Sequence, residues 1–441
     1  MIRACAAALA ALALTGSAAA AGTGPQPPLP PQVRGDPPAG APPGPAAGLR
    51  SPQRCTPPPA DDDTSSGGSG GSGTGAARLQ LTEVHRLATG RGQLIAVIDT
   101  GVYPHRSLGD RLRGGGDYLT GADGREDCDG HGTAVAGLLA AAAEPGPDGR
   151  VDPPISIAPG AQLLAIRQSS PSFTVPGPDG DRPAGDTDTL AEAIVLAVRE
   201  GAGIVNISEA VCLAPDRAAV AGASLHAALR YAAEARVVVV AAAGNVGTGS
   251  CGKPGSHQVS LPGWYDDELI TVGAVGPDDT PAPFTVPGPW VDVAAPGTGL
   301  RSLAVGGGTT TTGVEGTSFA VPWVAGLAAL VRERFPELTA QQVTDRILAT
   351  ARRPAGGQDD ALGYGVIDPI AALTAVPAVL VPRPEVETRI ADLPGIVRPP
   401  AASDPIWPGD LAVAGTLLAA SVAAAVLLRR GPRRVRRSRV R

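Results

Sequence analysis

Short, continuous apolar runs alternate with longer apolar-periodic segments through the middle of this chain, between about residues 79 and 376. Short runs rich in Val, Ile and Leu are typical of strands that are buried on both faces. They predict strands at 93–98, 162–166, 203–207, 237–241 and 269–272. The longer segments predict helices at 131–143, 188–199 (with Thr187 or Asp188 as N-cap), 217–235, 318–334 and 339–349. Such alternation predicts an α/β fold in which helices flank both faces of a mainly parallel sheet.

Segments rich in Pro and Gly interrupt or flank this pattern. Residues 169–185 and 280–288 are predicted to be surface loops. Residues 22–78 carry no apolar periodicity and are predicted to form an extended or flexible N-terminal arm without a core. Residues 377–408 are predicted to be a Pro-rich linker, which leaves 79–376 as the folded domain.

The N-terminus has the organisation of a secretory signal peptide at residues 1–21. Arg3 gives a basic start, an apolar run extends from Ala4 to Leu14, and an Ala-rich stretch follows. An N-terminal membrane anchor is the alternative, but the run is short and dominated by alanine. We therefore expect cleavage near residues 20–22 and export of the chain.

A second apolar segment near the C-terminus predicts a membrane span at 409–428. Residues 411–428 hold no charged side chain, and Trp407 precedes them at interfacial depth. The Arg-rich tail at 429–441 is then predicted to be cytoplasmic, with the rest of the chain outside. Nucleic-acid binding by the tail is the alternative, which the adjoining span disfavours. The net charge of −6 includes this basic tail, so the exported part is acidic and no nucleic-acid partner is expected.

Cysteine usage fits an exported protein. Cys5 leaves with the signal peptide, and Cys55, Cys128, Cys212 and Cys251 remain. Four cysteines outside the cytoplasm predict two disulfides, for which three pairings are open. Free buried thiols are the less favoured alternative.

Three segments carry candidate chemistry. Ser318, in Gly316-Thr317-Ser318-Phe319-Ala320-Val321-Pro322, stands before a long apolar run, where helix N–H groups favour a developing oxyanion. His131 lies between glycines at the start of an apolar helix, and Asp99 ends an apolar strand. Singly, these residues also fit a helix cap, a packing histidine and a turn residue. Together they offer a nucleophile, a base and an orienting carboxylate. The other histidines, His85, His105, His226 and His257, are predicted to be surface or loop residues.

The segments Asp99-Thr100-Gly101, His131-Gly132-Thr133 and Gly316 to Pro322 resemble the signature blocks of subtilisin-like serine proteases. Their order along the chain, Asp then His then Ser, is also that of subtilisin. The resemblance implies a subtilisin-like three-layer fold, with Ser318 as nucleophile, His131 as general acid and base, and Asp99 orienting it. It also places Asn245, in Ala242-Ala243-Gly244-Asn245, in the oxyanion hole, where a plain turn residue is the alternative.

Within that family the layout resembles the mycosins, the membrane-anchored proteases of type VII secretion systems. The shared features are the signal peptide, the Pro-rich arm, the C-terminal span and the segments Asp127 to His131, Asn206-Ile207-Ser208 with Cys212, and Trp264-Tyr265-Asp266. This resemblance implies disulfides Cys55–Cys128 and Cys212–Cys251. It also implies exported protein substrates and a type VII secretion membrane complex as partners.

Two features depart from ordinary subtilisins. Residues 22–76 lack the pattern of a folded pro-domain, so removal of such a domain is not expected to be the activation switch. Where the family has Leu-Gly-Gly after Asn206-Ile207-Ser208, this chain has Glu209, Ala210 and Val211, from which we expect a narrower substrate cleft.

The sequence thus predicts a single-pass, outward-facing serine endopeptidase with no cofactor and no metal site. The acidic runs 61–63 and 266–268 are interpreted as solvated loops rather than calcium ligands. Two rival hypotheses are a general cell-surface protease of the same chemistry and a scaffold that stabilises the secretion complex without catalysis.

Overall fold

The computed structural model describes residues 27–31, 35–41, 43–55, 57, 60–61, 74–143, 155–177, 180–252, 256–310 and 312–376. The signal peptide, linker, membrane span and basic tail expected from the sequence lie outside these residues. Within the described ranges, no helix is both long enough and apolar enough to cross a membrane.

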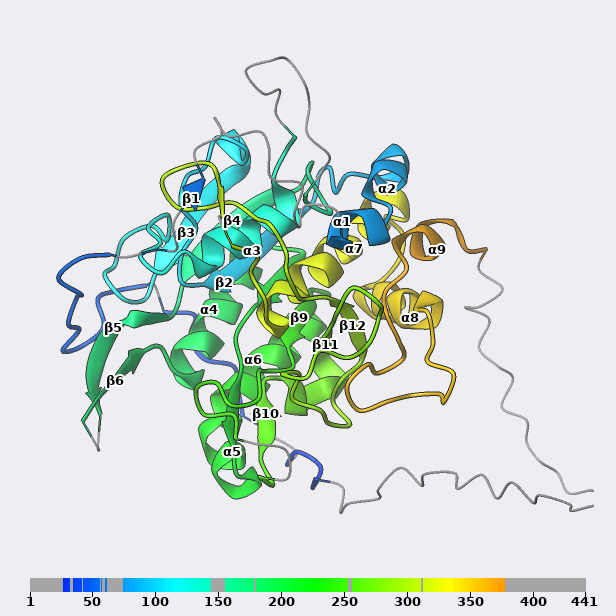
Figure 1. Ribbon diagram of the computed structural model, residues 1–441. Coiled ribbons are helices and arrows are strands. Elements are labelled where there is room, and N and C mark those ends of the chain that lie inside the picture. Colours follow the sequence, from blue (N-terminus) through cyan, green and yellow to red (C-terminus); the bar gives the residue numbers. More distant parts are fainter. Residues whose placement is uncertain are drawn as a thin grey trace, which may run out of the picture. The chain divides into compact units, whose positions relative to one another are not determined.

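A parallel sheet of seven strands forms the centre of the molecule, in the order β12-β11-β9-β7-β2-β4-β3 (Figure 1). Its strands are β2 (Leu94–Asp99), β3 (Leu112–Asp117), β4 (Gln162–Arg167), β7 (Ile204–Ile207), β9 (Val238–Ala242), β11 (Ile270–Val275) and β12 (Val293–Pro296). The chain extends the sheet first on one side of β2 and then on the other. The carboxyl end of β2 therefore lies where the strand order reverses, which is where parallel α/β sheets place their sites.

Helices cover both faces of the sheet, as the sequence predicts. On one face lie α2 (Leu81–Leu87), α3 (His131–Ala140), α7 (Val321–Arg334), α8 (Ala340–Thr350) and α9 (Pro369–Thr374). On the other lie α4 (Thr187–Arg199), α5 (Pro215–Ala221) and α6 (Ala223–Glu234).

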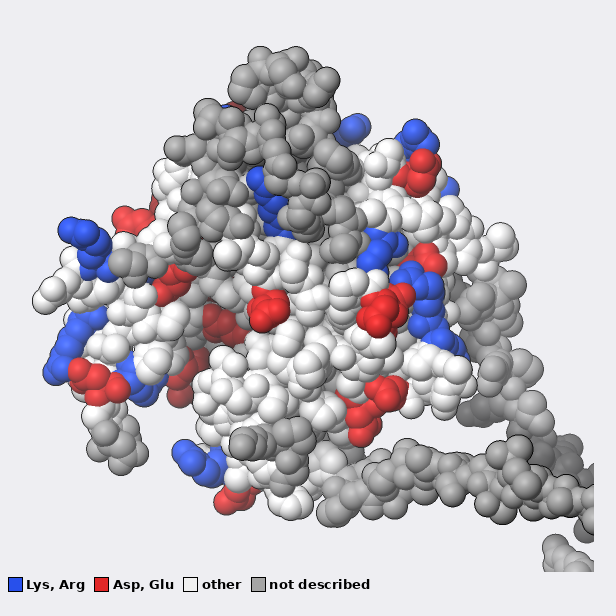
Figure 2. All heavy atoms as spheres, viewed as in Figure 1, with Lys and Arg blue, Asp and Glu red and all other residues white. Residues whose placement is uncertain are grey.

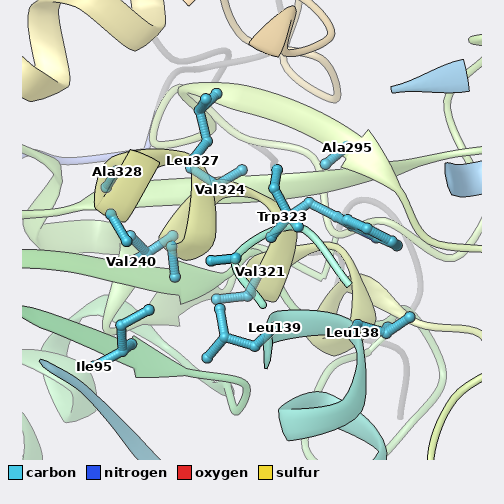
Figure 3. Packing of buried hydrophobic residues seen from close by; sticks show 14 of the residues in the cluster. Ile95, Leu138, Leu139, Val240, Ala295, Val321, Trp323, Val324, Leu327 and Ala328 are labelled. Atoms are coloured by element: carbon cyan, nitrogen blue, oxygen red, sulfur yellow. The ribbon is translucent and has the colours of Figure 1, made fainter. Parts of the chain in front are cut away.

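Alternate residues of each strand supply the two cores. In β2, Ile95 and Val97 pack toward α3 and α7, whereas Ala96 and Ile98 pack toward α4 and α6. Figure 3 shows the first core, in which residues of α7, among them Val324 and Leu327, lie over Ile95 and Val240 of the strands. This two-sided burial is why the strands appear in the sequence as continuous apolar runs.

Several predicted boundaries differ from those of the structure. The N-cap of α4 is Asp186, whose side chain accepts from the Thr189 N–H, so the predicted caps Thr187 and Asp188 are wrong. The helix predicted at 217–235 is broken into α5 and α6 at Gly222, because glycine is a poor helix former.

The predicted loop at 169–185 is instead an antiparallel hairpin of β5 (Ser170–Gly177) and β6 (Gly180–Ala184). It projects at the left of Figure 1. Phe173 and Val175 are buried in a small satellite core with Leu119 and Cys128. The hairpin is therefore stabilised by contacts to distant segments that its own Pro- and Gly-rich sequence does not reveal.

The described residues of the N-terminal arm up to Asp61 are extended or form turns and lie against the domain, whereas its last residues, 74–78, form the short helix α1, which the sequence did not predict. The Ala46 N–H donates to the Leu119 carbonyl over 2.9 Å, and Arg50 exchanges two backbone hydrogen bonds with Thr174 of β5. Leu49 packs on the satellite core, and the described residues include disulfides Cys55–Cys128 and Cys212–Cys251. The pairing implied by the resemblance is thus confirmed.

The remaining elements are short. Strand β1 (Ala60–Asp61) pairs with β13 (Thr309–Thr310), β8 (Val211–Leu213) pairs with β10 (Val259–Leu261), and α1 (Thr74–Arg78) precedes α2. Within the described part of the chain, the 3₁₀ turns are η1 (Gly109–Arg111), η2 (Gly263–Glu268) and η3 (Thr317–Phe319). On the face drawn in Figure 2, acidic and basic side chains are interspersed and separated by uncharged surface.

Candidate active site

A carboxylate and an imidazole meet at the carboxyl end of β2. Asp99 is fully buried, and its Oδ1 lies 2.7 Å from His131 Nδ1. Asp99 Oδ1 also accepts the Thr100 N–H over 2.7 Å, which holds the carboxylate in place. Because Nδ1 of the ring is bonded to Asp99, Nε2 is the nitrogen left to face a reactant. The side chain of His131 is 29 % exposed, so the ring is accessible.

Asp127 fastens the first turn of α3 to this strand end. Its carboxylate accepts from Gly130 N–H, from the N–H and hydroxyl of Thr133, and from the Thr100 hydroxyl, at 2.6–2.9 Å. A negative charge at a helix N-terminus is favourable, and here it also fixes the backbone around His131.

Residue 132 has room only for glycine. A Cβ there would lie 2.0 Å from the Gly101 carbonyl oxygen and 3.0 Å from Asp99 Oδ1. The motif His131-Gly132-Thr133 therefore allows α3 to approach the end of β2 closely enough for the Asp99–His131 hydrogen bond.

Ser318 lies in η3, immediately before α7, rather than in the long helix predicted to start at 318. The side chain of the next residue, Phe319, contacts His131, with ring centroids 5.0 Å apart. The Ser208 hydroxyl donates to the Ser318 carbonyl over 2.8 Å, which ties η3 to the end of β7. Between the described residues His131 and Ser318 no hydrogen bond joins Nε2 to Oγ, and such bonds are often long in resting enzymes.

Asn245 follows β9 and its side-chain amide is oriented by Thr317. Its Oδ1 accepts the Thr317 N–H over 2.9 Å and the Thr317 hydroxyl over 3.1 Å, which leaves Nδ2 as a donor. A Cβ on Gly316 would lie 3.1 Å from Ser318 Oγ and 3.3 Å from Asn245 Nδ2. The hydroxyl and the amide donor therefore border one small space, which glycine keeps open.

Several acidic side chains lie close enough to the His131 imidazole to change its pKa. Burial lowers the pKa of His131, but Asp99, and then Glu209 and Asp127, raise it more, to about 9. Burial is also the main cause that raises the pKa of Glu209 to about 8, reinforced by Asp99 and Asp129 and opposed by His131. The site thus stabilises the imidazolium that His131 becomes when it accepts a proton as a general base.

Two other histidines are buried. His105 lies in a loop, as predicted, whereas His226 lies in α6, so its predicted surface or loop setting is wrong. His105 Nδ1 accepts the Ser107 N–H, and its Nε2 lies 3.1 Å from the Gly308 carbonyl oxygen. His226 stacks on Tyr265 and lies 3.2 Å from Glu268. Apart from Ser107, these partners are far in sequence, so the local composition around each histidine did not indicate burial.

No role in supporting the site was predicted for Asp127 or Ser208 from the sequence. Asp127 has a local signal, an acidic residue just before a helix N-terminus. Ser208 has none, because its partner Ser318 is 110 positions away. Among the residues described, no group of three or more His, Cys, Asp or Glu side chains is arranged to hold a metal ion.

Comparison with known proteins identifies the family and the relatives of this chain. Residues 90–365 match the subtilase family. The chain is 44 % identical to mycosin-4 of Mycobacterium tuberculosis over 313 residues, covering 67 % of this chain and 68 % of that protein. It is 38 % identical to mycosin-1 of Mycolicibacterium smegmatis over 389 residues, covering 81 % and 84 %.

Solved structures give the same picture. The MycP3 protease from the type VII (ESX-3) secretion system aligns with a TM-score of 0.67 at 39 % identity, covering 79 % of this chain and all of that one. A chain of an intact ESX-5 inner membrane complex aligns with a TM-score of 0.69 at 35 % identity, covering 90 % and 98 %.

Proposed function

Since this chain belongs to the subtilase family, and within it to the mycosin serine proteases of type VII secretion systems, we propose that it processes a few exported proteins by endopeptidase cleavage. The chain's own chemistry supports this function. The proposal rests on the 2.7 Å contact between Asp99 Oδ1 and His131 Nδ1. This contact lies beside η3, the turn that contains Ser318.

In the proposed mechanism, His131 Nε2 takes the hydroxyl proton of Ser318 as Oγ attacks the peptide carbonyl carbon. Asp99 holds the ring and stabilises the imidazolium that forms. Asn245 Nδ2 and the Ser318 backbone N–H donate to the oxyanion. The imidazolium then gives its proton to the leaving amine, and water, activated by the same base, hydrolyses the acyl-enzyme on Ser318 Oγ.

The proposed location is the cell membrane, with the catalytic domain at 79–376 outside and the tail at 429–441 in the cytoplasm. The predicted signal peptide and membrane span support this topology. It agrees with the similarity to chains of the ESX-5 inner membrane complex and of its periplasmic assembly. The type VII secretion membrane complex is accordingly the proposed partner.

The decisive experiment compares the masses of exported proteins between cells with the wild-type chain and cells with Ser318→Ala. We expect a small number of exported proteins to remain at their unprocessed mass in the variant. Changes in mass in many proteins of the cell surface and the culture medium would favour the rival hypothesis, a general cell-surface protease. Identical masses in both strains would contradict the proposed function.

A second function, stabilisation of the secretion complex, is favoured by one observation. The alignment covers 98 % of a chain that is part of an intact inner membrane complex. The similarity therefore extends over nearly all of that chain and is not confined to the residues around the catalytic site. The same Ser318→Ala strain separates the two functions, because processing lost with secretion intact would mark catalysis and scaffolding as distinct.

A further inference from the structure

A fully buried amide, that of Asn206, stands in the apolar row of β7 that faces α3 and α7. Successive residues of a strand point to opposite faces of the sheet, so Asn206 shares its face with Ile204, which belongs to the core on that side. Its register partners on the neighbouring strands, Val97 and Val240, belong to the same core. Figure 3 shows Val240 beneath residues of α7. A polar group at such a place is unfavourable unless it is hydrogen-bonded.

Asn206 makes only some of the hydrogen bonds that an amide can make. Its Nδ2 donates to the Ser208 hydroxyl oxygen over 2.9 Å. Among the described residues, no group donates to its buried Oδ1. Because a buried acceptor without a partner destabilises the folded state, an apolar side chain would suit this place in the core better. The stability of the core therefore does not explain the amide.

The bond from Asn206 sets the direction of the Ser208 hydroxyl. Ser208 Oγ also lies 2.8 Å from the Ser318 carbonyl oxygen, which can only accept a hydrogen bond. The one hydroxyl proton of Ser208 must therefore point to Ser318, and the second contact of Oγ must come from a donor. Nδ2 of Asn206 is that donor, and it favours the hydroxyl orientation in which the proton points to Ser318.

The Ser318 carbonyl depends on Ser208 because of a proline one turn later. In an α-helix this carbonyl would accept the N–H of the residue four positions on. That residue is Pro322, which has no N–H. The Ser208 hydroxyl supplies the missing hydrogen bond where the chain passes from η3 into α7.

The backbone is thus held on both sides of the reactive residue. Before it, the Thr317 N–H donates to Asn245 Oδ1 over 2.9 Å. After it, the Ser318 carbonyl is held by Ser208. The Ser318 N–H and Oγ lie between these two bonds. The bonds come from the ends of β7 and β9, which are neighbours in the sheet and form a rigid support.

We propose that Asn206 is a positioning residue for the nucleophile, acting through Ser208 to fix the orientation of Ser318 Oγ and its backbone N–H. The inference rests on the proposed protease function, because it gives Asn206 a part in the same reaction. A purely structural amide would affect the free energy of unfolding. A positioning residue affects the rate at which Ser318 Oγ attacks, with little effect on substrate binding.

The test replaces Asn206 with valine, the residue type of both register partners, in the purified full-length protein. We expect kcat on a peptide substrate to fall roughly 10- to 100-fold, since a slight misplacement of a reacting group costs factors of this size. KM should change by less than about twofold. Labelling of Ser318 by a fluorophosphonate, in which Oγ bonds to phosphorus and fluoride leaves, should slow by the same factor as kcat.

Two further variants complete this comparison. Asn206→Ala serves as a second replacement, with folding of both variants checked by calorimetry. Thr271→Val is the matched control and should leave kcat and labelling unchanged. Thr271 is also a fully buried strand residue, and its hydroxyl has no hydrogen-bond partner in the part of the chain that the structure describes.

A double variant tests the route through Ser208. Ser208→Ala should slow labelling about as much as Asn206→Val does. The protein with both changes should be slower than either single variant by less than about twofold, because residues in one hydrogen-bonded chain do not act independently.

The outcomes separate this inference from the proposed function. Wild-type kcat in Asn206→Val, a raised KM at unchanged kcat, or losses that multiply in the double variant would overturn the inference and leave the protease function standing. Loss of folding in both Asn206 variants would also overturn it, because the amide would then serve stability.

Should the wild type react with the fluorophosphonate but cleave no peptide, the function fails and the labelling rates decide the inference. Slower labelling of Asn206→Val that disappears in the Ser208→Ala background supports it, and equal rates overturn it. A wild type that neither cleaves nor reacts would contradict both, since Ser318 would then not be a nucleophile.

Discussion

Cys55 of the N-terminal arm is bonded to Cys128 in the segment that leads into His131. Cys128 is also part of the satellite core, onto which Leu49 of the arm packs. The arm therefore reaches the segment next to His131 both covalently and by apolar contact. Its described residues brace this side of the domain without the packed core of a folded pro-domain.

Removing this bond should destabilise the domain. The disulfide spans a sequence separation of 73 residues, and closing a loop of that size in the unfolded chain is worth roughly 4 kcal/mol in the chain-entropy description. We expect Cys55→Ser with Cys128→Ser to lower the melting temperature, measured by calorimetry, while peptide cleavage at 25 °C stays about as fast. The control is Cys212→Ser with Cys251→Ser, which removes the other disulfide. That disulfide closes a loop with a sequence separation of 39 and does not involve the segment before His131. A large rise in cleavage rate would instead identify the arm as an inhibitory propeptide.

Asp99, His131 and Ser318 should behave as one catalytic unit. Ser318→Ala, His131→Ala and Asp99→Asn should each lower kcat on a peptide substrate by about 10⁴-fold or more, since each alone disables proton transfer. The double variant Ser318→Ala with His131→Ala should be hardly slower than either single one. Multiplying losses in the double variant would show that the residues act separately and that the assignment is wrong.

The value of kcat/KM should rise with pH into the alkaline range. His131 must be neutral to act as a base, and the surrounding carboxylates hold its pKa at about 9, above the ordinary value of 6.5. Activity should therefore increase from pH 7 to beyond pH 9 as the imidazole loses its proton. Glu209→Gln removes one of the negative charges that raise this pKa and should move the midpoint to lower pH. A wild-type midpoint at or below 6.5 would contradict the electrostatics of the site.

The membrane topology can be tested on intact, wall-stripped cells. The domain is expected outside, so added protease should release a soluble fragment that ends within the linker at 377–408. The Arg-rich tail at 429–441 should remain protected until the membrane is opened, which serves as the control. A tail that is cleaved in intact cells would reverse the proposed orientation and remove the support for a secretion-linked role.

The sequence predicted the interior of the sheet well and its margins poorly. Strands β2, β4, β7, β9 and β11 were found within one or a few residues, because burial on both faces makes each a continuous apolar run. The edge strand β3, whose sequence is Leu-Arg-Gly-Gly-Gly-Asp, was missed because it has almost no apolar residues. The β5–β6 hairpin was missed because its stability comes from Leu119, Cys128 and the arm.

By itself the sequence determined the alternation of strands and helices, and the residue types able to carry out acyl transfer, because both depend on local composition and spacing. The tertiary structure alone decided which of these residues meet. Asp99 and His131 are brought to 2.7 Å by the approach of α3 to β2, and Ser208 reaches Ser318 across 110 positions of the chain. Glu209 lines a cavity together with Gln168 and Ser169 because β7 and β4 flank β2 in the sheet, an order set by packing between distant segments rather than by local periodicity.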